Sequence, residues 1–417
     1  MVDQLERYRA TLKNLDDVIA GARLTLLGFS VAVDAVHRLT AEQIAAIYAH
    51  ATTDDGKPGE LCRGIWELVR SGTDGEVWVD WPQASQWLIS RLPTHYYSIG
   101  GNAGQAANVL SVLGVRSLLA LTDRRPTQLA TLGSSVRLAA PDGSLIAPAQ
   151  AQPTPEPGRP AHHVVEFSAG TPLPPRCGAE PATISRSGRV IMRFAYDGPA
   201  YDEDFARAAR ERAGHAGAGL VTGLNKVPPH DVDHAYQWCR QRAAQWREAG
   251  VEFVHHEVSD YPRQLRTVRE LAPSVNSLGL SERELVSLSG WRGDPADRAA
   301  ALLIEYGLDR VTVHGDRWAL AVSTADPERE LHTLLVACLL AGARAQHGEP
   351  VRPVELPPLA RLLPTDELPP PARHPGLSSV CIPTLWQRRP AATVGLGDTF
   401  VAGTLLALGS SCPPLAV

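Results

Sequence analysis

A short glycine-rich segment near the C-terminus carries the residue types that proton and phosphate chemistry requires. It reads Gly395-Leu396-Gly397-Asp398, and an apolar stretch with helical periodicity follows it. The start of a helix presents backbone N–H groups without helical partners, which suit a phosphate or a developing anion. Asp398 could accept a proton from a hydroxyl group held against this turn, as in phosphoryl transfer to an alcohol. An aspartate that merely caps a helix after a glycine turn is an equally good interpretation.

A second glycine segment, Gly100-Gly101-Asn102, opens a helix lined with small residues. The glycines let a ligand approach the backbone, and Asn102 can both donate to and accept from a sugar hydroxyl. A close-packed helix start with Asn102 as a local cap is the alternative. Asp34 follows the apolar run 24–29, which we interpret as a buried strand, so it lies on the ligand side of a parallel sheet. A turn carboxylate on the surface is the alternative for Asp34.

Two kinds of strand pattern position these segments. Continuous apolar runs, typical of buried strands in a mostly parallel sheet, lie at 24–29, 115–121, 219–223, 251–258, 274–279, 310–314 and 318–322. Helical patterns separate them, at 40–70, 124–133, 234–249, 263–271 and 328–346, and Ser281 to Leu285 reads as a capping box. Alternating strands at 76–81, 94–99, 162–167 and 189–194 indicate a sheet that is exposed on one face. The pattern predicts an α/β fold with a smaller β-rich part.

Composition excludes several classes of protein. The chain has 417 residues, 44% of them hydrophobic, and a net charge of -5, so no basic field favours nucleic acid. The six cysteines form no C-x-x-C pair, and residues 1–20 do not resemble a signal peptide. The longest apolar run, 331–343, is too short to cross a bilayer. We therefore expect a cytoplasmic protein that binds small molecules and neither nucleic acid nor membrane.

The order of the motifs resembles one known family, the ADP-dependent glucokinases and phosphofructokinases of the ribokinase-like superfamily. The motifs are Gly28-Phe29 with Asp34, the stretch 100–108, His255-x-Glu257, the stretch 275–285 and the stretch 393–400. The resemblance implies a doubly wound, mostly parallel sheet with a small β-rich lid domain. It places the large domain at 1–33, 100–160 and 198–417, and the lid at 34–99 and 161–197. It also implies a monomer or small homo-oligomer.

The same resemblance implies a kinase that transfers the terminal phosphoryl group of ADP, with Mg²⁺, to a hydroxyl of a sugar, sugar phosphate or sugar-like acceptor. Asp398 would be the base, and the backbone of Gly395, Leu396 and Gly397 would form the anion hole. The remaining assignments are Glu257 and Glu284 for the metal, Asp34, Glu76, Gly101, Asn102 and Arg189 for the substrate, and His314, Val380, Cys381, Ile382 and Thr393 for the nucleotide.

The chain departs from the family pattern at four positions. Ser30 and Ala32 stand where the family has asparagines that would contact or frame the sugar, so the identity of the acceptor is open. Asn276 and Ser281 replace an aspartate and the asparagine of the magnesium motif. Two alternatives stay open, an ATP-dependent ribokinase-like carbohydrate or nucleoside kinase and a non-catalytic binding relative. The intact stretch 395–398 favours catalysis.

Overall fold

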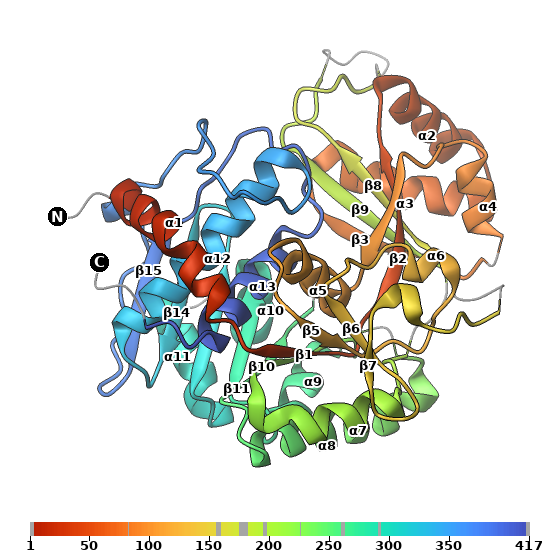
Figure 1. The fold of residues 1–417 in the computed structure, drawn as a ribbon. Helices are drawn as coiled ribbons and strands as arrows, with labels where there is room; N and C mark the ends of the chain where they lie inside the picture. Colours follow the sequence, from red (N-terminus) through yellow and green to blue (C-terminus); the bar gives the residue numbers. More distant parts are fainter. Residues whose placement is uncertain are drawn as a thin grey trace.

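Two β-sheets organise the chain in the computed structural model (Figure 1). The structure describes residues 4–81, 83–155, 160–174, 182–194, 198–225, 227–259, 263–290 and 293–413. The strands of the large sheet are, in sheet order, β15 (Ser378–Pro383), β14 (Trp318–Ser323), β13 (Arg310–His314), β12 (Ser277–Ser281), β11 (Phe253–Glu257), β10 (Ala216–Val221), β1 (Leu24–Gly28), β5 (Ser117–Leu119), β6 (Val136–Ala139) and β7 (Leu145–Ile146).

The large sheet is parallel from β13 to β6. At one edge β14 pairs antiparallel with both β13 and β15, and at the other edge β7 pairs antiparallel with β6. Leu27 of β1 pairs with Leu220 of β10, and both side chains are fully buried. Burial on both faces explains why these strands read as continuous apolar runs in the sequence. The predicted α/β class with a mostly parallel sheet is confirmed.

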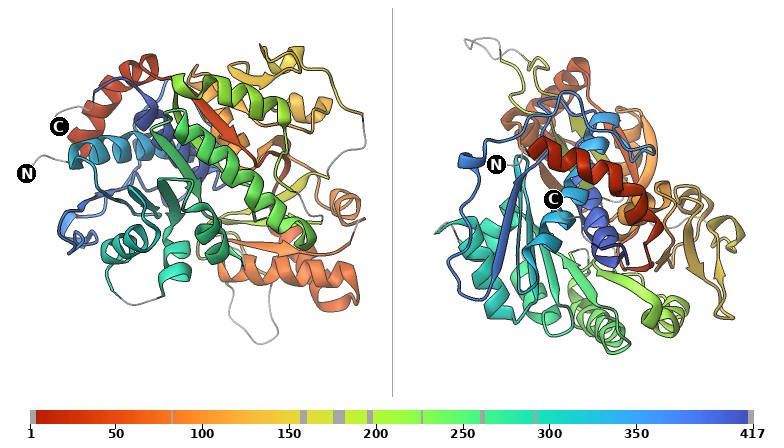
Figure 2. Two further views of the ribbon diagram at one scale, coloured as in Figure 1. Left: turned by 90° about the horizontal axis from the view of Figure 1, so that it is seen from below. Right: turned by 60° about the vertical axis from the view of Figure 1, so that its left-hand side comes forward.

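Helices cover both faces of the large sheet (Figure 2). One face carries α1 (Gln4–Ala20), α5 (Asn102–Val112), α12 (Pro327–His347) and α13 (Leu396–Gly409), which share one hydrophobic cluster. The other face carries α7 (Glu203–Arg212), α8 (Val232–Glu248), α9 (Gln264–Leu271), α10 (Glu282–Ser289) and α11 (Pro295–Tyr306), which share another. From Glu330 to Ala345, every residue of α12 except Ala341 is buried, as its apolar run predicts.

The small sheet lies beside the large one and has the order β3 (Gly75–Trp78), β9 (Gly188–Arg193), β8 (His162–Phe167), β2 (Ala32–Arg38) and β4 (Tyr96–Gly100). Its outer face packs against α2 (Ala41–Thr53), α3 (Lys57–Ser71) and α4 (Ala84–Ile89), as Figure 1 shows. Along β9, buried residues alternate with partly exposed ones. That alternation is the pattern expected of a sheet with one covered face.

Several expectations need correction. Asp34 does not end the first strand of the large sheet; it lies inside β2 of the small sheet. The helical stretch 40–70 is two helices, because Gly56 stands before α3 with φ 80° and interrupts the pattern. The predicted helix at 124–133 contains only the single turn α6 (Pro126–Leu129), and the sequence analysis did not foresee α7 and α11.

The proposed domain limits 34 and 99 fall inside β2 and β4, and the division of the chain into two domains stays a prediction. Among the described helices, none combines the length and apolarity that a membrane span needs.

Candidate active site

The glycine turn at the start of α13 has the geometry of an anion site. Gly395 stands at the cap position with φ 72° and ψ 13°, a left-handed conformation that glycine adopts without strain. The first helical hydrogen bond runs from Thr399 N to Gly395 O at 2.9 Å. The N–H groups of Leu396, Gly397 and Asp398 precede that bond and have no partner within the helix. Asp398 lies inside the first turn, so the interpretation of it as a helix cap is wrong.

A second helix start meets this turn. Asn102, the first residue of α5, donates from Nδ2 to Oδ1 of Asp398 at 2.8 Å. The cap position of α5 is Gly101 at φ 78°, so Asn102 does not serve as a local cap. Burial raises the pKa of Asp398, while Arg344, Arg189 and the Asn102 hydrogen bond oppose that rise. Asn102 thus binds Oδ1 of the carboxylate, and among the described residues Oδ2 accepts no hydrogen bond, so it can act as a proton acceptor.

The glycines before α5 bring Asp34 close to the same place. A Cβ on Gly100 would lie 2.1 Å from Oδ1 of Asp34, so no larger residue fits there. A Cβ on Gly101 would lie 2.5 Å from the carbonyl oxygen of Ser30. His162 of β8 lies beside Asp34, with 3.6 Å between Nδ1 and Oδ1. Asp34 of β2 thus lies against the glycine segment that leads from β4 into α5, and Asn102 is the first residue of that helix.

The small sheet also holds the segment just before the turn. Glu166 of β8 accepts hydrogen bonds at Oε1 from the backbone N–H of Thr393, at 2.9 Å, and of Val394, at 3.4 Å. Arg189 of β9 donates to the carbonyl oxygen of Thr393 at 3.1 Å. The side chain of Val394 packs against valines of β2 and β8. Thr393 was expected to bind nucleotide, and in the structure Glu166 and Arg189 of the small sheet bind its backbone. We call these hydrogen bonds the Glu166 clasp.

A histidine–carboxylate cluster lies at the ends of β11 and β13. Glu257 accepts from Nε2 of His255 at one oxygen and from Nε2 of His314 at the other, both at 3.0 Å. Burial alone would raise the pKa of Glu257, but the two histidine hydrogen bonds outweigh it and lower the pKa to about 2. Burial lowers the pKa of His314, and Glu257 reverses this to a net rise. A Cβ on Gly397 would lie 3.1 Å from the His314 ring, so the cluster touches the glycine turn.

Glu284 lies near this cluster and closes the predicted capping box. Its Oε2 accepts from the N–H of Ser281 at 2.6 Å, and Ser281 Oγ accepts from the N–H of Glu284 at 3.3 Å. Burial, with the nearby charge of Glu257, raises the pKa of Glu284 to about 7. Within the described part of the chain, no three histidine, cysteine, aspartate or glutamate side chains are arranged to hold a metal ion directly.

Comparison with known proteins places this site in a family. The family model described as "ADP-specific Phosphofructokinase/Glucokinase conserved region" matches residues 26–407. The chain belongs to this family. Membership confirms the family predicted from the motifs, and with it the class of enzyme, a phosphotransferase.

Individual relatives are distant but nearly complete in length. The chain is 24% identical to the ADP-specific phosphofructokinase of Thermococcus litoralis, over 90% of this chain and 94% of the relative. It is 25% identical to that of Pyrococcus abyssi, over 77% of this chain and 80% of the relative. A solved ADP-dependent kinase complexed with fructose-6-phosphate and ADPbetaS has a TM-score of 0.76, 17% identity and 99% coverage of both chains. The ancestral ADP-dependent phosphofructokinase of Methanosarcinales has a TM-score of 0.71, 18% identity and 98% coverage of both.

In this family member, Glu76 does not lie next to Asp34. It is an exposed residue of the edge strand β3, paired at 2.5 Å with Arg193 of β9. Three strand spacings separate β3 from β2, which is roughly 14 Å. A ligand in contact with both residues would have to extend along the small sheet.

The nucleotide assignments on β15 are also spread out. β15 lies two strands away from His314, at the edge of the large sheet. Val380 and Cys381 are partly exposed, whereas the Ile382 side chain is 1% exposed and packs in the core cluster with α12 and α13. A contact from Ile382 to a nucleotide would therefore have to come from its backbone.

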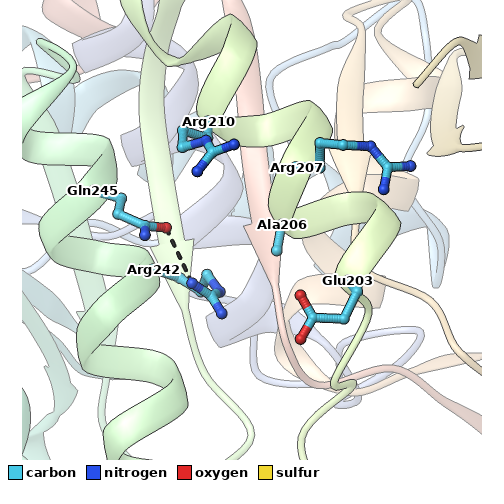
Figure 3. A pocket seen from close by; sticks show the side chains of 6 residues that line it. All are labelled: Glu203, Ala206, Arg207, Arg210, Arg242 and Gln245. Atoms are coloured by element: carbon cyan, nitrogen blue, oxygen red, sulfur yellow. Dashed lines mark hydrogen bonds between the residues drawn. The ribbon is translucent and has the colours of Figure 1, made fainter. Parts of the chain in front are cut away.

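A cavity of about 180 Å³ lies elsewhere, between α7 and α8 (Figure 3). Its lining residues are Glu203, Ala206, Arg207, Arg210, Arg242 and Gln245. Both helices cover the face of the large sheet opposite α5 and α13. This cavity is not part of the candidate active site.

The sequence analysis missed Glu166 and Arg344. Glu166 is the one acidic residue in the strand His162–Phe167, and a charge inside a buried strand was the available signal. Arg344 follows directly on the apolar run of α12, where a basic residue is usually interpreted as a partner of the helix dipole.

Proposed function

We propose that this kinase transfers the terminal phosphoryl group of ADP to a hydroxyl of a sugar or sugar phosphate and releases AMP. The observation that carries the proposal is the Asp398 carboxylate, fixed by Asn102 beside the N–H groups of the Gly395 turn that have no partner within the helix. A base and an anion site within one helical turn are what phosphoryl transfer to an alcohol needs. A protein that only binds sugar has no use for a base at this place.

In the proposed step, the acceptor hydroxyl gives its proton to the free oxygen of Asp398. The acceptor oxygen forms a bond to the terminal phosphorus, and the bond from that phosphorus to the bridging oxygen breaks, which leaves AMP. The N–H groups of Leu396 and Gly397, at the positive end of α13, stabilise the charge on the phosphoryl oxygens.

On the acceptor side, Asp34, Gly101 and Asn102 would hold sugar hydroxyls, and Arg189 would hold a phosphate group from the small sheet. Fructose 6-phosphate is the first acceptor to test, because the relatives are named ADP-specific phosphofructokinases and one structural neighbour was solved with fructose-6-phosphate. Ala32 offers no side-chain hydrogen bond to a sugar, so glucose is expected to be a poor acceptor.

Glu257 and Glu284 would hold Mg²⁺ through water molecules. The fit rests on burial and charge: burial, with the nearby charge of Glu257, raises the pKa of Glu284 to about 7, and a cation would favour the charged form of both carboxylates. Their oxygens are engaged by His255, His314 and Ser281, which disfavours direct coordination by both. When bound, the ion would neutralise charge on the donor phosphates.

The proposal is tested by incubating the protein with ADP and a panel of sugars, sugar phosphates and nucleosides, followed by detection of the phosphorylated product. Asp398→Asn, purified in the same way, gives the background from contaminating kinases. Product from the wild type and none from the variant supports the proposal. Ligand binding without product from any acceptor would instead favour a non-catalytic relative.

A further inference from the structure

The guanidinium of Arg344 packs against Gly395, at the start of α13. Arg344 stands near the end of α12, and its side chain is 6% exposed. A Cβ on Gly395 would lie only 2.3–2.5 Å from three guanidinium atoms of Arg344. Glycine is favoured at 395 for two reasons: it adopts the left-handed backbone without strain, and any side chain there would have to displace the Arg344 guanidinium.

The hydrogen bonds of Arg344 join the two helix starts that form the site. Its Nη1 donates to Oε1 of Gln105 in α5 at 3.0 Å, and to Oγ1 of Thr399 in α13 at 3.1 Å. The Thr399 hydroxyl donates in turn to the carbonyl oxygen of Gly395 at 2.7 Å. Arg344 thus connects α5 and α13 through Gln105 and Thr399, and the Asn102–Asp398 hydrogen bond connects the same two helices at a second place.

The charge of Arg344 is not neutralised locally. Both of its hydrogen bonds go to neutral oxygens, and its Nε is buried without a partner. Among the described residues, it forms no ion pair within 4.0 Å. A buried cation close to two positive helix ends is costly unless negative charge is present nearby. Asp398 and Glu166 supply some of that charge at longer range.

We propose that Arg344 is a positioning residue for phosphoryl transfer. It stabilises the conformation of the Gly395 turn through its packing against Gly395 and its hydrogen bond to Thr399. Its positive charge keeps the Asp398 carboxylate ionised and favours an anionic phosphoryl group at the start of α13. This inference rests on the proposed function, and Arg344 acts through Gly395 and Asp398 without contact to the substrate.

The test compares Arg344→Met, which removes the charge, with Arg344→Lys, which keeps it without the guanidinium fork. Arg298→Met is the matched control, because Arg298 is also buried and, among the described residues, its hydrogen bonds go to the neutral oxygens of Ser289 and Leu285, on the opposite face of the sheet. The readouts are thermal stability, the pH profile of kcat/KM, and the rise in melting temperature that pyrophosphate causes.

Loss of the cation makes Asp398 harder to ionise, so the acidic limb of kcat/KM is expected to move up by about one pH unit in Arg344→Met. Its kcat/KM is expected to fall about 100-fold, and the effect of pyrophosphate to disappear. Arg344→Lys should keep the wild-type limb and the pyrophosphate effect with a smaller loss of rate. Arg298→Met should lower only the melting temperature.

The proposal would be overturned if Arg344→Lys and Arg344→Met had the same pH profile of kcat/KM and the same response to pyrophosphate. It would also be overturned if the acidic limb of Arg344→Met lay at the wild-type pH. If Arg344→Met does not fold, a shifted limb in Arg344→Lys contradicts the role of the charge, and a wild-type limb supports it. If the wild type transfers no phosphoryl group, the proposed function fails separately. The pyrophosphate effect then still decides on Arg344, because its persistence in the methionine variant would contradict the inference.

Discussion

Oε1 of Glu166, in the small sheet, accepts a hydrogen bond at 2.9 Å from the backbone N–H of Thr393, just before the Gly395 turn, although the two residues are 227 positions apart in sequence. Val394 donates to the same oxygen, and Arg189 binds the Thr393 carbonyl from the neighbouring strand. The small sheet therefore fixes the segment that enters the turn. A movement of that sheet would change the position of the N–H groups that we propose bind the phosphoryl group.

Glu166→Gln should weaken the hydrogen bonds of the Glu166 clasp to Thr393 and Val394, because an amide oxygen accepts hydrogen bonds more weakly than a carboxylate. We expect faster hydrogen exchange at residues 393–398 and roughly a tenfold loss of kcat/KM. Exchange measured by mass spectrometry reads the first effect directly. Glu270→Gln, which removes only a surface pair with Arg240, is the control. Unchanged exchange at the turn in Glu166→Gln would contradict the clasp.

Asp398→Asn should reduce kcat by about 100-fold or more while ADP binding stays nearly the same, because asparagine keeps the shape without the basicity. Burial raises the pKa of Asp398, so the wild-type acidic limb should lie above the ordinary carboxyl value of about 3.9. Asp326→Asn is the matched control, since Asp326 caps α12 away from the turn. A variant at Asp398 with wild-type kcat would remove the base from the mechanism.

The sequence predicted what depends on local pattern. The turn at Gly395, the Ser281 capping box and the buried run of α12 follow from spacing within a few residues. Long-range placement could not be predicted in this way. The clasp by Glu166 and the bonds of Arg344 join segments that only the folded chain brings together.

Asp34 shows the same limit within one short segment. Nothing in the residues after Gly28 says that the chain leaves the large sheet and starts β2 at Ala32. The pattern of apolar residues simply continues across the crossing. Only the pairing of Ala32 with Gly100 reveals that the chain has entered the small sheet.

Magnesium should bind more tightly as the pH rises through neutrality. Glu284 has a pKa of about 7 without a cation, and the ion favours its charged form, so protons compete with Mg²⁺ below that pH. The apparent Kd for Mg²⁺ with ADP present should fall about tenfold from pH 6 to pH 8. Titration calorimetry measures it, and excess EDTA should abolish turnover. Glu284→Gln should bind Mg²⁺ weakly with little pH dependence, whereas Glu282→Gln, in the same turn of α10, should keep the wild-type dependence.

Acid should destabilise the small sheet through a buried histidine pair. Nε2 of His37 lies 2.8 Å from Nδ1 of His163, and burial lowers the pKa of His163 to about 3. Below the ordinary pKa of about 6.5 the histidines of the unfolded chain are protonated, whereas the buried pair in the folded chain stays neutral. The free energy of unfolding therefore falls as the pH drops from 6.5 towards 3. The slope reaches about 1.4 kcal/mol per pH unit for each histidine.

Urea unfolding between pH 7.5 and pH 5 checks this slope. His163→Gln should be less stable at neutral pH but should lose stability more slowly as the pH falls. His215→Gln, at an exposed position, should keep the wild-type slope. The same slope in His163→Gln and the wild type would contradict the assignment to this pair.

Separation of the spent nucleotides after turnover tests most directly whether ADP is the phosphoryl donor. In the proposed mechanism, the turn at Gly395 and the base Asp398 fix where the transferred group must lie, so the distance to the adenine site decides whether one or two phosphates fit between them. With ADP and a phosphorylated acceptor as product, AMP should appear in equal amount, and ATP should be a poor donor. Formation of ADP from ATP at a higher kcat/KM than that of AMP from ADP would contradict the proposed donor.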